Sequence, residues 1–217
     1  MRVLVPVNEL ERAKGRLADV LEPAARAALA LATVGTVVEA IRGAGHEPVL
    51  LTRDARVRSA FAGLAAVLDE DPAAQGLNGQ IESAVARLAG AGDLEELLIL
   101  HADLPLANAQ AIRDLVEEAP LAPSVTLVRS ADGGTNAMLL RPPGRFALAY
   151  GADSFEHHCG AAVAACMAVA VAESPALALD VDTPADIERL IALPEGRVSA
   201  AGQALARAGV HLPAGPQ

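Results

Sequence analysis

The sequence has few aromatic residues: it contains no Trp, one Tyr and three Phe. It therefore offers few side chains for stacking on bases, which is a common way of binding single-stranded nucleic acids. The net charge of -10 at pH 7 also opposes a polyanionic partner. A nucleic acid polymer is therefore not an expected partner, whereas a small phosphorylated ligand can still be bound by a local basic loop.

Cysteines and long apolar runs are also scarce. Cys159 and Cys166 are seven positions apart in a helical pattern, which places their Cα atoms roughly 10 Å apart, too far for a disulfide. The longest apolar run, Cys159 to Ala172, is shorter than the ~20 residues of a membrane span. The N-terminal run from Met1 to Val7 is too short for a signal peptide. These features predict a reduced, cytoplasmic protein with no membrane partner.

Apolar segments of strand length alternate with amphipathic segments of helix length, which is typical of a mostly parallel sheet covered by helices. Two strands at 124–129 and 137–141 are joined by a short link and predict a hairpin. We expect one domain over residues 1–193, followed by a C-terminal extension at 194–217. The extension has one weak helix, at 198–208, and a Pro/Gly tail.

Acidic residues follow two of the apolar segments. Asp103 follows the apolar strand predicted within residues 95–105, and Asp180 and Asp182 end the apolar run from Ala178. In a strand, alternate residues point the same way, so Asp180 and Asp182 would share a face just before a helix that starts at Thr183. Carboxylates held together repel one another, and a divalent cation relieves that repulsion. We therefore predict a magnesium site made from Asp103, Asp180 and Asp182, a solvated acidic cap being the alternative.

The main basic cluster follows the first strand, where Lys14 and Arg16 flank Gly15. It could hold a triphosphate, although neither a P-loop nor a dinucleotide-binding motif is present. A solvated helix end explains the same residues without any function.

Three polar segments are candidates for anion or ligand binding. The segment Gly133-Gly134-Thr135-Asn136 is suited either to a tight turn or to a nest of free backbone N–H groups. Ser154 is expected to cap a helix over 156–167, whose N-terminus would attract a carboxylate or phosphate. Asn78 is expected either to cap a helix over 79–88 or to contact a ligand.

Taken together, these motifs resemble the 2-phospho-L-lactate or phosphoenolpyruvate guanylyltransferases that begin assembly of the deazaflavin coenzyme F-420. The resemblance covers residues 3 to about 190. It is carried by Val5-Pro6-Val7, Ala13 to Leu17, Gly76-Leu77-Asn78, Ala102-Asp103-Leu104-Pro105, Gly133 to Ala137, Gly151 with Ser154-Phe155 and His158, and Leu179 to Pro184.

The resemblance implies the nucleotide-diphospho-sugar transferase (glycosyltransferase A-like) fold, and GTP and a small phosphorylated carboxylic acid as partners. That acid would be 2-phospho-L-lactate, phosphoenolpyruvate or 3-phosphoglycerate, with hand-over of the product to the next enzyme of the pathway. The implied roles are catalysis and Mg²⁺ binding for Asp103, Asp180 and Asp182, phospho-acid binding for Thr135, Gly151 and Ser154, and nucleotide binding for Lys14, Arg16 and Asn78.

The chain departs from the family pattern at two places. Asn8 stands where a lysine is frequent, and Ala152-Asp153 replaces a Pro-Gly pair. Other functions also remain open. They include a molybdenum-cofactor guanylyltransferase or sugar-phosphate nucleotidyltransferase of the same fold, and a non-catalytic nucleotide-binding protein. The D-x-D-x-T pattern at Asp180 also fits a haloacid-dehalogenase-type phosphatase, but too little chain follows it for that fold.

Overall fold

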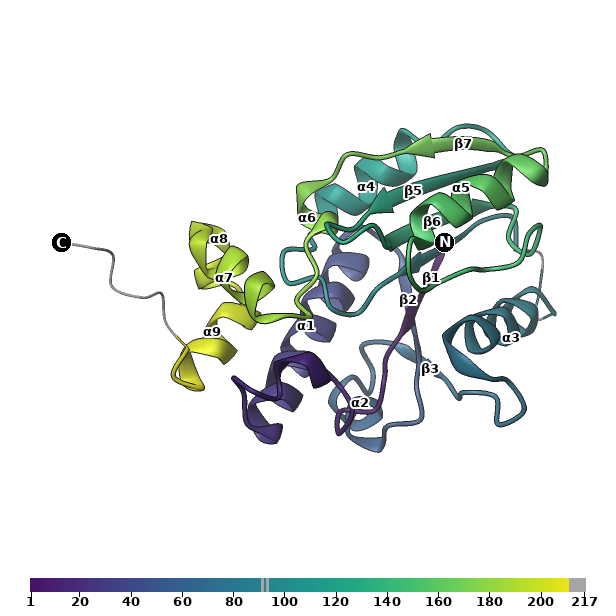
Figure 1. The fold of residues 1–217 in the computed structure, drawn as a ribbon. Coiled ribbons are helices and arrows are strands. Elements are labelled where there is room, and N and C mark those ends of the chain that lie inside the picture. Colours follow the sequence, from purple (N-terminus) through teal and green to yellow (C-terminus); the bar gives the residue numbers. More distant parts are fainter. Residues whose placement is uncertain (91, 93, 211–217) are drawn as a thin grey trace.

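The computed structural model describes residues 1–90, 92 and 94–210. Within these residues the core is one seven-stranded sheet, in the order β3-β2-β1-β4-β6-β5-β7 (Figure 1). The strands are β1 (Arg2–Pro6), β2 (Glu47–Leu51), β3 (Ala66–Leu68), β4 (Leu97–Leu100), β5 (Ser124–Arg129), β6 (Thr135–Arg141) and β7 (Ala168–Val171).

The sheet is mostly parallel, as predicted. β1 pairs in parallel with β2 and β4, β2 with β3, and β5 with β7. β6 runs antiparallel to both of its neighbours, β4 and β5. The predicted hairpin near 124–141 is therefore confirmed, and its returning strand lies beside β4, next to the strand end that carries Asp103.

Helices cover both faces of the sheet (Figure 1). They are α1 (Pro23–Gly43), α2 (Ala55–Ala60), α3 (Gly76–Gly90), α4 (Ala109–Glu117), α5 (Ser154–Ala164), α6 (Pro175–Ala178), α7 (Pro184–Ala192), α8 (Pro194–Val198) and α9 (Ala200–Arg207), with a 3-10 turn, η1 (Gly15–Leu17).

Alternation along the strands divides the core into two layers. Val3 and Val5 of β1 face α1 and α4, whereas Leu4 faces α3 and α5. All three side chains are fully buried. Successive strand residues point to opposite faces, so both faces of this sheet are apolar and both need a covering of helices.

Helix α1 is long and apolar enough to cross a membrane by length and composition alone. In the fold the apolar side of α1 packs against the sheet. Its residues Val34, Val37, Val38 and Ile41 are buried in the layer between them. A core helix of a globular protein passes the same length and composition test. The apolar character of α1 is thus accounted for by packing.

Two segments differ from the predicted elements. The run before Asp182 is not a strand, because α6 occupies Pro175–Ala178 and residues 179–182 form an irregular link to α7. Pro175 fits the first helical turn and favours α6 at this point. The helix predicted to reach Met167 ends at Ala164, and β7 follows directly. Cys166 has φ 55° and lies outside any helix, and both cysteines are free.

The C-terminal segment contains two helices, α8 and α9, where one was predicted at 198–208. With α7 they pack beside α1 (Figure 1), around a third apolar cluster that includes Leu29, Leu190, Ala201 and Leu205. The Pro/Gly tail at 211–217 lies outside the described residues.

Candidate active site

Three carboxylates meet at the edge where β4 ends. Asp103, Asp180 and Asp182 each offer an oxygen, and these oxygens all lie within 4.8 Å of one another. Asp103 follows β4, whereas Asp180 and Asp182 come from the link between α6 and α7. The juxtaposition expected from the sequence is therefore present, although a loop delivers two of its members.

Backbone contacts hold that loop in place. The Val181 N–H donates to the Asp103 carbonyl at 3.3 Å. The Asp186 carboxylate accepts from the N–H groups of Asp182, at 3.2 Å, and Thr183, at 2.8 Å. Thr183 and Asp186 form a capping box at the start of α7, which confirms the helix start predicted there. The same contacts that begin α7 thus fix the position of Asp182.

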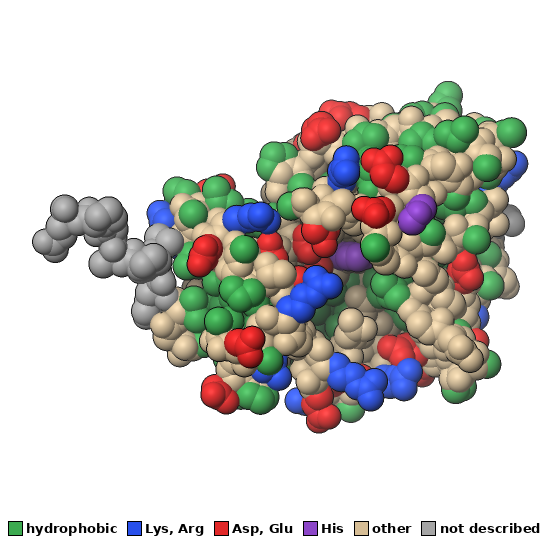
Figure 2. Space-filling model, viewed as in Figure 1, with side chains coloured by type: hydrophobic (Ala, Val, Ile, Leu, Met, Phe, Trp, Pro, Cys, Tyr) green, Lys and Arg blue, Asp and Glu red, His purple; other side chains and the backbone are tan. Residues whose placement is uncertain are grey.

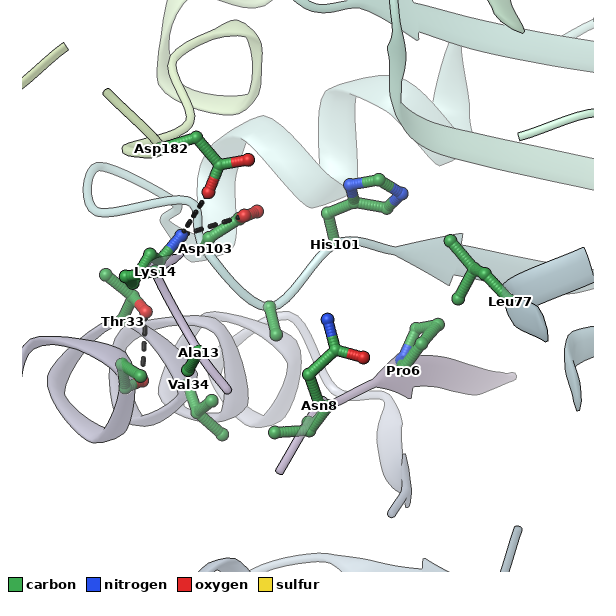
Figure 3. Close-up of a pocket in the computed structure, with 13 residues that line it drawn as sticks. Pro6, Asn8, Ala13, Lys14, Thr33, Val34, Leu77, His101, Asp103 and Asp182 are labelled. Carbon is green, nitrogen blue, oxygen red and sulfur yellow. Dashed lines mark hydrogen bonds and ion pairs between the residues drawn. The ribbon is translucent and has the colours of Figure 1, made fainter. Parts of the chain in front are cut away.

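Lys14 lies inside the acid cluster. Its Nζ donates to Asp103 Oδ2 and to Asp182 Oδ1, both at 2.9 Å, and its side chain is only 6% exposed (Figure 3). Burial on its own lowers the pKa of Lys14, but the two carboxylates outweigh it and the pKa is raised. The ammonium is therefore charged and tied to the carboxylates that were predicted to bind metal.

Asp180 differs electrostatically from the other two acids. Burial, followed by the charge of Asp103, raises its pKa to about 6. Burial would also raise the pKa of Asp103, but the Lys14 ammonium overcomes it and the pKa is lowered. The Asn136 amide donates to Asp180 Oδ1 at 3.4 Å and to the carbonyls of Leu177 and Ala178. Asn136 therefore connects β6 to the loop that carries Asp180.

The cluster fits a divalent cation. Three carboxylates and one ammonium leave about two negative charges, if all four groups are ionised. Asp103 Oδ1 is buried and has no hydrogen-bond partner among the described residues, which is the situation of an oxygen that lacks its ligand. An all-oxygen donor set is the kind that Mg²⁺ prefers.

A cavity of about 260 Å³ opens beside the carboxylates and is lined by Asn8, Lys14, His101, Asp103 and Asp182, among others. A second hollow shares Pro6, Val7, Asn8 and Leu77 with it and continues past the ends of β2 and β3 to Arg53 and Glu70. Figure 2 shows acidic, basic and histidine side chains gathered around a hollow on this face. The combined depression has room for a nucleotide at the carboxyl edge of the sheet.

The residues predicted to bind the phospho-acid also come together. The Ser154 hydroxyl donates to Thr135 Oγ1 at 3.3 Å, and the Ser154 N–H donates to the Gly151 carbonyl at 3.3 Å. Gly151 has φ 140°, a conformation that favours glycine. Thr135 is followed in β6 by Asn136, whose amide donates to Asp180, so this strand links the two groups of residues through its backbone.

Of the two alternatives for Gly133 to Asn136, the structure confirms the tight turn, and the predicted cap at Ser154 is wrong. The Gly133 N–H donates to the Ser130 carbonyl and the Gly134 N–H to the Asp132 carboxylate, so the turn is closed on itself and is not a nest of free donors. Ser154 is the first residue of α5, preceded by Asp153 in the left-handed conformation, and its side chain does not cap the helix. These local hydrogen bonds occupy the N–H groups of Gly133 and Gly134, which are therefore not available to bind an anion.

Asp153 and the remaining nucleotide candidates take different positions. Asp153 is exposed, so its negative charge faces solvent. Arg16 is also exposed.

Asn78 is in the first turn of α3, and its amide is bonded to the backbone N–H and carbonyl of Tyr150 at 2.7 and 3.0 Å. The predicted N-cap at Asn78 is therefore wrong, since α3 begins at Gly76 and Asn78 instead anchors the loop that leads to Gly151.

Two histidines of this region received no functional role from the sequence, although His158 is among the residues that carry the family resemblance. His101 lines the cavity, and its Nε2 is buried with no partner among the described residues. His158 is fully buried and bonded to Thr135. His101 alternates with Asp103 after β4, a pattern that could have pointed to it, whereas His158 is noted in the sequence only as part of the family pattern.

Comparison with known proteins identifies the family. The family model described as "Guanylyl transferase CofC like" matches residues 1–205. The chain belongs to this family. The chain is 41% identical over 195 residues to a phosphoenolpyruvate guanylyltransferase of Rubrobacter xylanophilus, which covers 86% of this chain and 91% of the relative. It is 33% identical to a 2-phospho-L-lactate guanylyltransferase of Haloterrigena turkmenica, with 88% and 84% covered. It is 31% identical to a 3-phospho-D-glycerate guanylyltransferase of Phenylobacterium zucineum, with 87% and 88% covered.

Solved structures agree on the fold. A putative nucleotide-diphospho-sugar transferase from Desulfovibrio desulfuricans G20 superposes with a TM-score of 0.74 at 17% identity, covering 95% of this chain and 94% of that chain. The predicted fold is thus confirmed. The family match supports a CofC-like guanylyltransferase over the other functions that the sequence left open.

Proposed function

We propose that this CofC-like guanylyltransferase uses Mg²⁺ to join GMP from GTP to phosphoenolpyruvate, releasing pyrophosphate, as a cytoplasmic step in coenzyme F-420 biosynthesis. The observation that carries the proposal is the cluster of Asp103, Asp180 and Asp182 around Lys14 at the mouth of the cavity. Phosphoenolpyruvate is preferred over 2-phospho-L-lactate and 3-phosphoglycerate because the relative with 41% identity is named for it.

The reaction needs positioning and charge neutralisation more than acid-base catalysis. A phosphate monoester has its second pKa near 6, so at neutral pH an oxygen of the acid's phosphate is already an anionic nucleophile. That oxygen forms a bond to the α-phosphorus of GTP while the bond from this phosphorus to the bridging oxygen of the β-phosphate breaks, and pyrophosphate leaves. The chain must hold the two reactants in line and stabilise the charge that develops.

The residues of the cluster divide this work. Asp103, Asp180 and Asp182 would hold Mg²⁺, which supplies charge neutralisation at the phosphates. Lys14 is poised beside them, and its ammonium can turn from the carboxylates to a triphosphate oxygen once a cation occupies the cluster. Arg16 is exposed close to Lys14 in sequence and would bind the outer phosphates. Thr135, Gly151 and Ser154 would form the wall of the acid site.

The deciding experiment measures pyrophosphate release with GTP, Mg²⁺ and each of the three phospho-acids in turn, using ATP, CTP and UTP as controls for the nucleotide. We expect release with GTP and phosphoenolpyruvate, and little with the other nucleotides. Release with GTP and another acid would reassign the substrate within the family. Absence of release with all three acids would reject the proposed function.

A further inference from the structure

His158 lies at the meeting point of the segments that form the candidate acid site. Its side chain is fully buried on α5. Its ring is packed edge-on against Tyr150, with the ring centroids 4.8 Å apart, and Phe146 lies further off, at 6.4 Å. A buried histidine bonded through both ring nitrogens is held in one orientation.

The hydrogen-bond partners assign the tautomer of this ring. The Ala149 backbone N–H donates to His158 Nε2 at 3.0 Å, so Nε2 must carry a lone pair. A neutral imidazole has a single N–H, which is therefore on Nδ1. His158 Nδ1 lies 3.0 Å from Thr135 Oγ1, so it is the histidine that donates and the threonine that accepts.

This assignment constrains the Thr135 hydroxyl. Its oxygen accepts from His158 Nδ1–H and also from the Ser154 hydroxyl, at 3.3 Å. A hydroxyl oxygen has two acceptor positions and one hydrogen. With both acceptor positions used, the Thr135 hydrogen is left to donate to a further acceptor. Thr135 and Ser154 are both buried and both belong to the proposed acid site, so that acceptor would be an oxygen of the phospho-acid.

The loop before Gly151 is held by three side chains. The backbone N–H groups of Leu148, Ala149 and Tyr150 donate to Glu82 at 3.0 Å, His158 at 3.0 Å and Asn78 at 2.7 Å, respectively. Loss of the middle bond alone leaves the loop fixed on both sides. Thr135 lies in β6, outside this loop. The bonds that Glu82 and Asn78 make to the loop therefore do not compensate for loss of the bond from His158 to Thr135.

We propose that His158 is a positioning residue for the acid substrate: its Nδ1–H directs the Thr135 hydroxyl to donate to an anionic oxygen of the phospho-acid. The inference rests on the proposed function and deepens it. His158 itself touches no substrate in this arrangement. Burial, together with the charges of His101 and His157, lowers the pKa of His158 to about 4, which keeps the ring neutral at physiological pH.

Two matched substitutions separate the two sides of the ring. In His158→Asn the shorter amide reaches the place of Nδ1 and can still donate to Thr135, whereas in His158→Gln the longer amide reaches the place of Nε2 and can accept only from Ala149. We expect His158→Gln to raise the KM for the phospho-acid by about tenfold, the loss of one hydrogen bond to a charged group, with the KM for GTP unchanged. His158→Asn should stay within about threefold of wild type. The exposed neighbour provides the control, His157→Asn.

Thr135→Val tests the same bond from the other side. It should match the effect of His158→Gln, and the double variant should be no worse than Thr135→Val alone, because both changes remove one interaction. Equal acid KM values for His158→Asn and His158→Gln, additive effects in the double variant, or a change in the KM for GTP would each overturn the proposal.

The tautomer of His158 can be measured by NMR without any assay of activity. Two-bond ¹H-¹⁵N correlation spectra of the ¹⁵N-labelled protein should show His158 as the Nδ1–H tautomer at neutral pH, with the signal identified by its loss in His158→Asn. A ring protonated on Nε2 would refute the assignment even if the enzyme were active. A correct tautomer in a protein that releases no pyrophosphate would instead count against the proposed function alone.

Discussion

At the scale of single residues, charge governs the acid cluster. Lys14 neutralises part of it, and the pKa of Asp180 is raised to about 6 by burial and by Asp103. Carboxylates in such a setting are costly to hold together without cations. This cost explains why the cluster is suited to ligand binding more than to stability.

Asp182→Asn should cut turnover by at least ~100-fold, because it removes one charged ligand of the proposed metal and one partner of Lys14. The Asp182 side chain is 44% exposed, so the melting temperature should change little. Pyrophosphate release and thermal unfolding measure the two effects. The exposed residue Asp19 provides the control, Asp19→Asn, which should behave like wild type. Near-normal activity of Asp182→Asn at ordinary magnesium would refute the metal site.

Lys14→Met should make the fold depend more on magnesium. Without the ammonium, Asp103 and Asp182 repel each other, so the melting temperature in chelator should fall below that of wild type, and Mg²⁺ should restore more of it. The KM for GTP should also rise, since the cation proposed for the triphosphate is gone. Thermal unfolding in chelator and in millimolar Mg²⁺ tests this, and an equal magnesium shift in the two proteins would contradict it.

Protonation of His158 should also affect stability. In the folded protein the pKa of His158 is lowered to about 4, mainly by burial and also by the charges of His101 and His157. The ring packs on the uncharged side chain of Tyr150. The unfolded chain then binds the proton more readily, so stability is complete above the ordinary pKa near 6.5 and is lost as pH falls towards 4. Denaturant unfolding between pH 7 and 4 should show a weaker pH dependence in His158→Asn than in wild type. Identical profiles would contradict the shift.

At the scale of elements, the helix starts position the site. Asp54 caps α2 by accepting from the N–H groups of Arg56, at 2.8 Å, and Val57, at 3.4 Å, and its other oxygen accepts from the Leu10 N–H at 2.8 Å. Burial would raise the pKa of Asp54, but these bonds and Arg56 lower it to about 2. One carboxylate thus fixes both a helix start and the loop between β1 and Lys14.

Asp54→Ala should lower the free energy of unfolding by about 2 kcal/mol, through loss of the cap and an unsatisfied buried Leu10 N–H. A modest rise in the KM for GTP should accompany it, because the loop that carries Lys14 is loosened. Asp69→Ala provides the control, since the exposed side chain of Asp69 makes a surface ion pair with Arg58, worth under ~1 kcal/mol. Denaturant unfolding measures both changes, and equal losses in the two variants would contradict the role of Asp54.

At the scale of the whole molecule, the C-terminal helices close the structure beside α1. Gly202 of α9 lies against the backbone of α8, where an added Cβ would overlap the carbonyl oxygen of Gly196. Gly160 of α5 has open space around it. Gly202→Ala should therefore destabilise the protein by more than ~1 kcal/mol, whereas Gly160→Ala should be neutral or stabilise it by up to ~1 kcal/mol through helix propensity. Melting temperatures of the two variants check this, and equal values would show that α9 is not closely packed.

The sequence by itself determined the sheet class, the hairpin, the helix start at Thr183 and the position of acidic residues at the ends of apolar segments. Each of these depends on residues near one another in the chain: an apolar period, a turn, a helix-capping pair. The motif order also indicated the family, which the comparison with known proteins confirms.

Tertiary structure alone decided which partner each polar group takes. Lys14 meets acids 89 and 168 positions away, Asn78 binds a loop 72 positions away, and the Gly133 and Gly134 N–H groups are used within their own turn. No local pattern carries such pairings, because they depend on how separate elements are brought together at one edge of the sheet. The sequence marks His158 only as part of the family pattern, and its role was not recognisable there for the same reason, since its tautomer is set by a backbone amide from one loop and a hydroxyl from the start of β6.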